Sequence, residues 1–215
     1  MPTIICRTEQ DEIGALDAFG NVVHHLRSTS MVTSDTKLVG YNILQFDAPV
    51  LVTRCRLLGV KPPALDIRKY GSKDITDVMA DLCFGLDPDK AILRRSQASM
   101  LARFGIESHD ATSGKDIAAM VERQDWEAIA AHCQADLDGL RELYRRLYGP
   151  KARGILVDLE TAAIEDAQDY RAFIKYDGRV SKPEAIEASI TEKLTKAALD
   201  PYLCRMVCLG YEVLG

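Results

Sequence analysis

The sequence contains no apolar stretch that approaches the ~20 residues needed to span a bilayer. Its opening, MPTIICRTEQDE, lacks the basic start and the long apolar segment of a secretion signal. The six cysteines form no Cys-x-x-Cys pair, and no histidine lies at zinc-finger spacing from them. These absences predict a cytoplasmic protein without a membrane partner, in which reduced cysteines serve as small core residues.

The chain also lacks the basic excess that is typical of proteins holding nucleic acid through bulk electrostatics. It has 27 Lys and Arg against 32 Asp and Glu, which gives a formal net charge of −5. This balance argues against a nucleic-acid coat protein or a tight DNA-binding module. It is compatible with an enzyme that contacts a few nucleotides, because carboxylates that bind metal ions add to the acidic count.

No internal repeat or low-complexity tract interrupts the 215 residues, so we expect a single domain over 1–215. Apolar patterning predicts five strands, at 2–7, 38–43, 64–67, 154–160 and 202–213. Helical spacing predicts seven helices, at 9–26, 47–58, 74–84, 96–104, 114–123, 126–148 and 184–199. Residues 150–153 resemble a connector between the helix at 126–148 and the strand that follows. Strands mixed with helices in this way predict an α/β or α+β domain.

The strand at 154–160 ends in two carboxylates, Asp158 and Glu160. Alternate residues of a strand point to the same face, so both side chains face the same way. Buried paired carboxylates are costly unless a cation compensates them, and Mg²⁺ prefers oxygen ligands of this kind. The alternative is a strand that ends at the surface with two solvated acids.

Two further patterns carry candidate ligands. His132 and Asp136 lie four residues apart on one face of the long helix at 126–148, whereas Asp138 points elsewhere. Taken alone, this spacing also fits an ordinary ion pair on a helix. Asn42 and Asp47 lie where a strand passes into a helix, and an Asp at that position is ordinarily a helix cap.

Taken together, these residues resemble the motifs of the 3′–5′ exonucleases of the DEDD superfamily. The chain is most similar to the predicted exonucleases related to the proofreading domain of family B DNA polymerases. Asp158 and Glu160 match the family's first motif, Asn42 with Asp47 in NILQFD matches the second, and Asp136 matches the third. The supporting segments 71–85, 125–147 and 198–213 also resemble the family, so the likeness covers nearly the whole chain.

The chain departs from the family in motif order, which is II, III, I rather than I, II, III. Residues 1–149 carry motifs II and III, and residues 154–215 carry motif I and the first two strands of the family order. Placing 153–215 before 1–149 restores the usual order, and the join at the present termini then resembles a β-hairpin. A circular permutation at an exposed turn is physically tolerable.

The second departure is His132, which occupies the place of the family's tyrosine four residues before Asp136. Histidine titrates closer to neutral pH than tyrosine, so it could position or deprotonate the attacking water. It could equally weaken catalysis. Arg54 is a candidate phosphate contact, and a helix-surface arginine is the alternative.

The resemblance implies a ribonuclease H-like fold, with a mixed five-stranded sheet flanked by helices. It implies a hydrolase that releases nucleoside 5′-monophosphates from single-stranded DNA 3′ ends with two Mg²⁺ or Mn²⁺ ions. Asp158, Glu160, Asp47 and Asp136 would hold the metal, and His132 would act on water. The terminal nucleotide would contact a further set of residues, namely Thr161, Asn42 and Phe46. A catalytically weak nucleic-acid-binding or scaffold module and an RNA-directed exonuclease remain the alternatives, and a replication or repair partner is unspecified.

Overall fold

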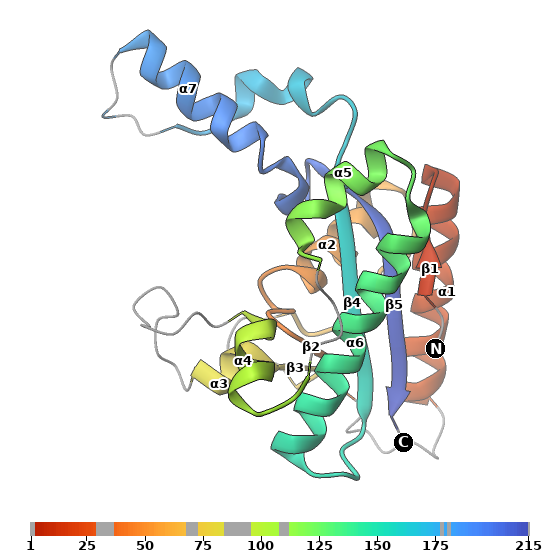
Figure 1. Ribbon diagram of the computed structural model, residues 1–215. Helices are drawn as coiled ribbons and strands as arrows, with labels where there is room; N and C mark the ends of the chain where they lie inside the picture. Colours follow the sequence, from red (N-terminus) through yellow and green to blue (C-terminus); the bar gives the residue numbers. More distant parts are fainter. Residues whose placement is uncertain are drawn as a thin grey trace.

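The computed structural model shows a mixed five-stranded sheet flanked by helices, with a helical arm beyond one end of the sheet (Figure 1). The residues that the structure describes are 3–28, 37–67, 73–83, 96–107, 112–176, 179 and 182–214. The α/β class and the mixed five-stranded sheet are therefore confirmed. The proposed hairpin turn at the joined termini lies outside the described residues.

The sheet has the strand order β1-β5-β4-β2-β3. Its centre is the antiparallel pair β4 (Gly154–Ala163) and β5 (Cys204–Leu214). The short strand β1 (Thr3–Ile5) extends β5 antiparallel, with Thr3 opposite Gly210. On the other side, β2 (Leu38–Gly40) runs parallel to both β4 and β3 (Ile75–Asp77). The predicted antiparallel meander of 154–160, 202–213 and 2–7 is thus present.

Helices cover both faces of the sheet. One face packs against α1 (Glu9–Ser28) and α2 (Asp47–Leu57). The other packs against α4 (Gln97–Arg103), α5 (Ile117–Glu122) and α6 (Trp126–Tyr148). In Figure 1, α6 crosses in front of β4 and β5. None of the helices among the described residues is long and apolar enough to cross a membrane.

The side chains of β4 alternate between the two helical layers, as a strand buried on both faces requires. Ile155, Val157 and Leu159 join the core under α1 and α2. Leu156 and Ala162 join the cores under α6 and α5. Asp158 and Glu160 share the parity of Leu156 and Ala162, so they face the α6 layer.

A glycine lets α6 approach the sheet closely at this level. Gly210 pairs with Asp158 across β4 and β5. A Cβ atom at Gly210 would lie 2.6 Å from Leu137 Cδ1 and 2.7 Å from Cys133 Sγ, both on α6. No side chain larger than hydrogen fits there without displacing the helix. The glycine therefore holds α6 near the two acidic residues of β4.

The predicted strand at 64–67 is wrong, and the fifth strand is β3, at the start of the predicted helix 74–84. Side chains rather than a neighbouring strand satisfy the backbone of this segment. Arg27 Nη1 donates to the carbonyl of Ala64 at 2.6 Å, and the amide of Asp66 donates to Asp74 Oδ2 at 2.7 Å. Only α3 (Val78–Cys83) remains of the predicted helix.

Arg54 is neither a phosphate contact nor a surface residue, and both readings from sequence are wrong. Its guanidinium is 7% exposed and donates from Nε and Nη2 to the two carboxylate oxygens of Glu12 at 2.7 and 2.8 Å. Glu12 also accepts the amide of Met206 at 3.0 Å. A bidentate pair with this extra donor satisfies both charges inside the core and ties α1, α2 and β5 together.

All six cysteines are free thiols and buried, as predicted. Burial raises the pKa of Cys6 and of Cys204 to about 12 in each case, so both stay protonated at neutral pH. These residues act as small apolar side chains.

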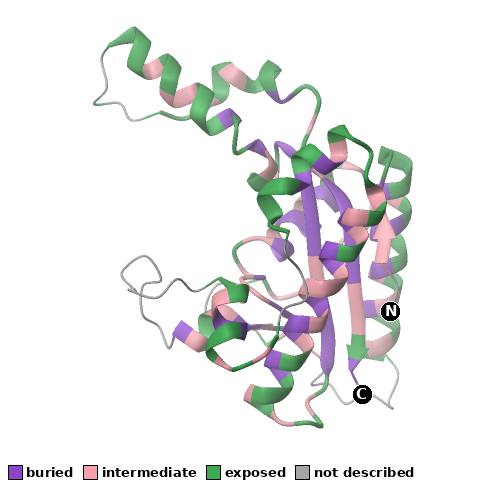
Figure 2. Cartoon of the chain, viewed as in Figure 1, coloured by how far each residue is buried: buried purple, intermediate pink, exposed green. Residues whose placement is uncertain are grey.

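The described residues between Ala163 and Cys204 form the arm, which leaves the end of β4 and returns into β5. It contains η3 (Ala167–Phe173), α7 (Pro183–Leu194) and η4 (Ala197–Leu199), so the predicted helix at 184–199 is present as α7 and η4. Figure 2 shows that the arm is far more exposed than the sheet. Its base is fixed by the hydroxyl of Thr161, which donates to the carbonyl of Ala198 at 2.6 Å.

Candidate metal centre

Three elements that are distant in sequence bring the predicted acidic residues together. Asp158 and Glu160 lie on β4, His132 and Asp136 on α6, and Asp47 is the first residue of α2. These five residues are called the carboxylate cluster below. Asp47 comes from the helical layer opposite α6, so it approaches β4 at the edge where β2 has ended.

Short distances between side chains define the part of the cluster that lies between α6 and β4. His132 Nε2 is 3.4 Å from Glu160 Oε1 and 3.9 Å from Asp136 Oδ2. One ligand atom from each of these three residues lies within 4.8 Å of the others. Successive turns of α6 therefore place His132 Nε2 and Asp136 Oδ2 next to the carboxylate of Glu160 on β4.

Three members of the cluster are buried, and Asp136 and Asp158 are half-buried. His132 and Asp47 are each 5% exposed and Glu160 is 7% exposed, whereas the side chain of Asp136 is 37% exposed. Solvent or a ligand therefore reaches the cluster past Asp136. A charged ligand entering here would meet groups that are shielded from water, so electrostatic interactions would be stronger than at the surface.

Burial and mutual repulsion oppose ionisation of these carboxyls. Burial, followed by the charges of Asp158 and Asp136, raises the pKa of Glu160 to about 10. Burial, followed by the charges of Asp136 and Asp47, raises the pKa of Asp158 well above its usual range. Groups that disfavour each other's charge in this way are close in space, and a bound cation would remove the conflict.

Asp47 is subject to the same forces. Burial raises its pKa to about 7, the backbone amides of Asp47 and Leu159 act in the opposite direction, and the charges of Asp77 and Asp136 add to the rise. The interaction with Asp136 links the start of α2 to α6. All four predicted carboxylates are thus electrostatically coupled within one site.

Asp158 gives the clearest evidence that a cation fits this cluster. Its Oδ2 is buried and accepts no hydrogen bond from the residues that the structure describes. A buried carboxylate oxygen without a partner is costly, because nothing replaces the water that it loses on folding. The oxygen-rich donor set fits a hard divalent cation such as Mg²⁺ or Mn²⁺, with the imidazole as an added ligand or base.

Sequence reasoning missed Asp77, the last residue of β3. Its Oδ1 accepts the amides of Asn42 and Ala80, and its Oδ2 accepts the amide of Leu44, each at 3.1 Å. Asp77 thus orders the turn between β2 and α2 in which Asn42 has a φ of 63°. The sequence gives no clear signal for Asp77, because the strand Ile75–Asp77 contains one apolar residue and the surrounding pattern predicts a helix at 74–84.

The residues predicted to bind the terminal nucleotide flank the cluster. Asn42 Oδ1 is buried and has no partner among the described residues. Phe46 is the residue before α2 and packs against the core under α1 and α2. Thr161 is 8% exposed, and its hydroxyl is engaged with the arm. Their role in nucleotide binding stays a prediction.

No protein-family profile matches this chain, and no curated protein or solved structure is significantly similar to it. The class of protein that the fold and the site define is therefore an α/β protein with a buried His/Asp/Glu group able to hold a metal ion.

Proposed function

We propose that this protein is a metal-dependent 3′–5′ exonuclease of the DEDD superfamily, built on a circularly permuted ribonuclease H-like fold. One observation supports the proposal above all others. The residues that match the family's three motifs come from α2, α6 and β4. Ligand atoms of Glu160, Asp136 and His132 nevertheless lie within 4.8 Å of one another, and the charges of Asp158 and Asp47 act on the same site.

The sheet also supports the permutation. If 154–214 is placed before 3–148, the strands read β4, β5, β1, β2, β3, and the first three form an antiparallel meander. The next two strands then run parallel to the first, with β2 beside β4 and β3 at the edge. This arrangement matches the one that the resemblance implies. The strand ends Thr3 of β1 and Leu214 of β5 point toward the same end of the sheet, because Thr3 pairs with Gly210, four residues before Leu214, as a permuted join needs.

Each residue of the carboxylate cluster then has a task. Asp158 and Glu160 would hold divalent cations together with Asp136 and Asp47, and the unpartnered Oδ2 of Asp158 would find its ligand. When bound, the cations would neutralise the scissile phosphate and lower the pKa of the attacking water. His132 would orient that water and accept its proton.

The reaction is hydrolysis of the last phosphodiester bond. The water oxygen bonds to phosphorus, the bond from phosphorus to the 3′ oxygen of the preceding nucleotide breaks, and that oxygen takes up a proton. The released product is a nucleoside 5′-monophosphate. The net charge of −5 favours a single strand end over duplex DNA, because the chain lacks the basic surface that holds a duplex by bulk electrostatics.

The test is digestion of 5′-labelled single-stranded DNA with Mn²⁺, with Mg²⁺ and with EDTA. The wild type should give products that shorten from the 3′ end with either metal and no products in EDTA. Asp158→Asn should abolish cleavage. Asp138→Asn is the matched control, because Asp138 lies on α6 outside the cluster, with its side chain 47% exposed.

The same assay separates the alternatives. An RNA strand of the same sequence that is cut faster than DNA would identify an RNA-directed exonuclease, whose preference rests on the 2′-hydroxyl. No cleavage of either strand with any metal would refute the nuclease proposal and leave a binding module. His132→Tyr, which restores the residue of the family motif, would then show whether the histidine had removed activity.

A further inference from the structure

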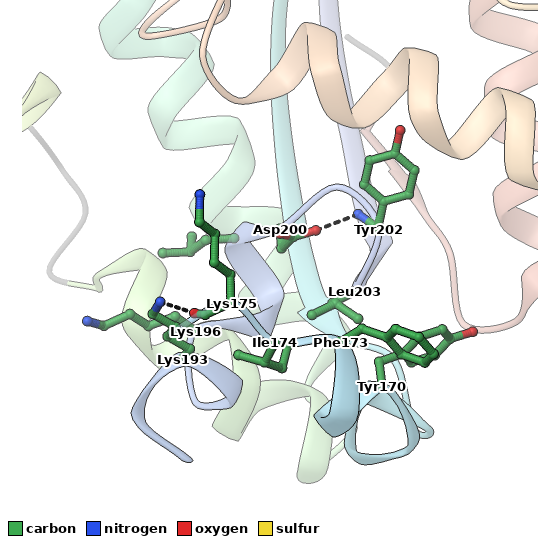
Figure 3. A pocket seen from close by; sticks show the side chains of 10 residues that line it. Tyr170, Phe173, Ile174, Lys175, Lys193, Lys196, Asp200, Tyr202 and Leu203 are labelled. Carbon is green, nitrogen blue, oxygen red and sulfur yellow. Dashed lines mark hydrogen bonds between the residues drawn. The ribbon is translucent and has the colours of Figure 1, made fainter. Parts of the chain in front are cut away.

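The arm contains a pocket of about 600 Å³ that lies outside the carboxylate cluster. Aromatic rings and lysines line it, with Tyr170, Phe173 and Tyr202 on one side and Lys175, Lys193 and Lys196 on the other (Figure 3). These six residues are called the arm pocket below. They come from η3, the segment after it, α7 and its C-terminal extension, and the turn before β5.

The rings of the arm pocket are unusually exposed for their size. Phe173 is 83% exposed, Tyr202 is 67% exposed and Tyr170 is 42% exposed. A single exposed aromatic residue is ordinary, but several around one pocket mark a surface that binds something. Flat, exposed rings with few rotatable bonds are suited to stacking on other rings.

The charge of the arm pocket is locally positive, in contrast to the chain as a whole. Three lysines face one acidic residue, Asp200, whose Oδ1 already accepts the amide of Tyr202 at 2.8 Å. The ammonium group of Lys193 donates to the carbonyl of Lys175. Lys196 forms an exposed ion pair with Glu192 at 2.8 Å, an interaction that contributes little and is readily exchanged for another anion.

Aromatic rings combined with lysines are the chemistry that recognises single-stranded nucleic acid. Bases stack on the rings whatever their sequence, and ammonium groups pair with the phosphates between them. A peptide partner would satisfy the rings, but it would have to be acidic to satisfy the lysines. A nucleic acid strand meets both needs with every nucleotide.

The arm pocket is close to the carboxylate cluster along the sheet. The amide of Ile164 donates to the carbonyl of Leu203, which lines the pocket, at 3.0 Å. Ile164 follows Glu160 by four residues, which is about 13 Å of extended strand. At the spacing of about 3.4 Å per nucleotide of a DNA strand, about four nucleotides span that distance.

We propose that the arm pocket is a second contact site for single-stranded nucleic acid and holds the strand a few nucleotides from the 3′ end. The bases stack on Tyr170, Phe173 and Tyr202, and the lysines pair with phosphates. The position of the 3′ end rests on the proposed function, but binding at the arm pocket does not.

Binding is measured without turnover, by fluorescence anisotropy of a labelled oligothymidylate of about 12 nucleotides in EDTA. Tyr170→Ala and Phe173→Ala should each weaken binding about tenfold, the loss expected for one stacked base. Tyr176→Ala is the matched control, because Tyr176 lies on the same arm with the same 42% exposure but does not line the pocket. Its affinity should equal that of the wild type.

The lysines are tested through salt. Lys193→Gln with Lys196→Gln should weaken binding and reduce the slope of log affinity against log salt by about 1.4, the value for two phosphates on a single strand. Lys182→Gln, on the exposed residue before α7, should leave the slope unchanged. The proposal would be overturned if the aromatic and lysine variants bound DNA as tightly as the wild type. It would also be overturned if the controls, Tyr176→Ala and Lys182→Gln, lost as much affinity as the pocket variants.

The outcomes also separate this proposal from the nuclease. Weaker binding by the arm variants, in a protein that cleaves neither DNA nor RNA, would support the arm pocket and refute the nuclease. Cleavage that depends on Asp158, in a protein whose arm variants bind like the wild type, would support the nuclease and refute the arm pocket.

Discussion

Replacing Asp47 by Asn should stabilise the metal-free protein at pH 8. Burial and the nearby acidic residues raise the pKa of Asp47 from 3.8 to about 7, so the folded state retains a proton that the unfolded chain has lost. Between about pH 4 and pH 7 the stability due to this group therefore falls as the pH rises, and above pH 7 the full cost is present. Asn carries no charge to bury and keeps the acceptor oxygen.

The size of the effect follows from the pKa. A pKa difference of one corresponds to about 1.4 kcal/mol, so the change from 3.8 to about 7 corresponds to about 4 kcal/mol. Rearrangement of the neighbouring carboxyls and entry of water will reduce this value, so we expect about 2 kcal/mol. For a chain of this length, that raises the melting temperature by roughly 4–8 °C.

The assay is thermal unfolding in EDTA at pH 5 and at pH 8. The variant should gain most at pH 8 and about a third as much at pH 5, because at pH 5 the unfolded chain has already lost the proton that folded Asp47 keeps. Asp138→Asn serves as the control and should change the melting temperature little at either pH, because Asp138 is half-exposed and Asn can still accept hydrogen bonds from Arg141 and Gln134. A loss of stability in Asp47→Asn at pH 8, or an equal gain at both pH values, would refute the reasoning.

Three further predictions concern stability. Mn²⁺ at about 100 times its Kd should raise the free energy of unfolding of the wild type by about 2.7 kcal/mol, measured by thermal unfolding. The stability of Asp158→Asn should not change, and an equal rise in both proteins would show that the metal binds elsewhere. Gly210→Ala should cost about 1–3 kcal/mol in urea unfolding and reduce cleavage, because α6 must move. Gly14→Ala is the control, because Gly14 lies on α1 with open space around it, and this change should leave the stability unchanged or raise it. If Gly210→Ala were as stable as the wild type, α6 would have moved to make room for the added methyl group without loss of stability. Arg54→Met should lower the free energy of unfolding by about 3–5 kcal/mol, because the charge of Glu12 stays buried without its cation. Adding Glu12→Leu should recover most of this loss, and no recovery would show that the loss is due to packing.

The sequence predicted the long elements well because each repeats its pattern several times. The strand predicted at 154–160 is β4, the one at 202–213 is β5, and the helix predicted at 126–148 is α6. The prediction from sequence was wrong for the edge strand of the sheet, β3. β3 has only three residues, one of them the polar Thr76, which is too short for a period of two to be detected. The apolar segment 64–67 was the better strand candidate by composition, but two side chains satisfy its backbone.

The candidate site was predictable where local spacing places residues on one face. Alternation on a strand related Asp158 to Glu160, and a spacing of four on a helix related His132 to Asp136. Tertiary pairings have no local signal. Neither the carboxylate of Asp77 under the β2–α2 turn nor the partner of Arg54 in α1 could be read from residues near them in sequence.

The strand order has a consequence for folding during synthesis. The two central strands, β4 and β5, are the last to be made, and β1 and β2 pair with them directly. The first two-thirds of the chain therefore emerges with apolar strands and helices that have no sheet to cover. Such long-range pairing is slow and leaves apolar surface open to aggregation until the chain is complete. We expect fragments that stop before residue 154 to depend on chaperones or to precipitate, however well their own helices form.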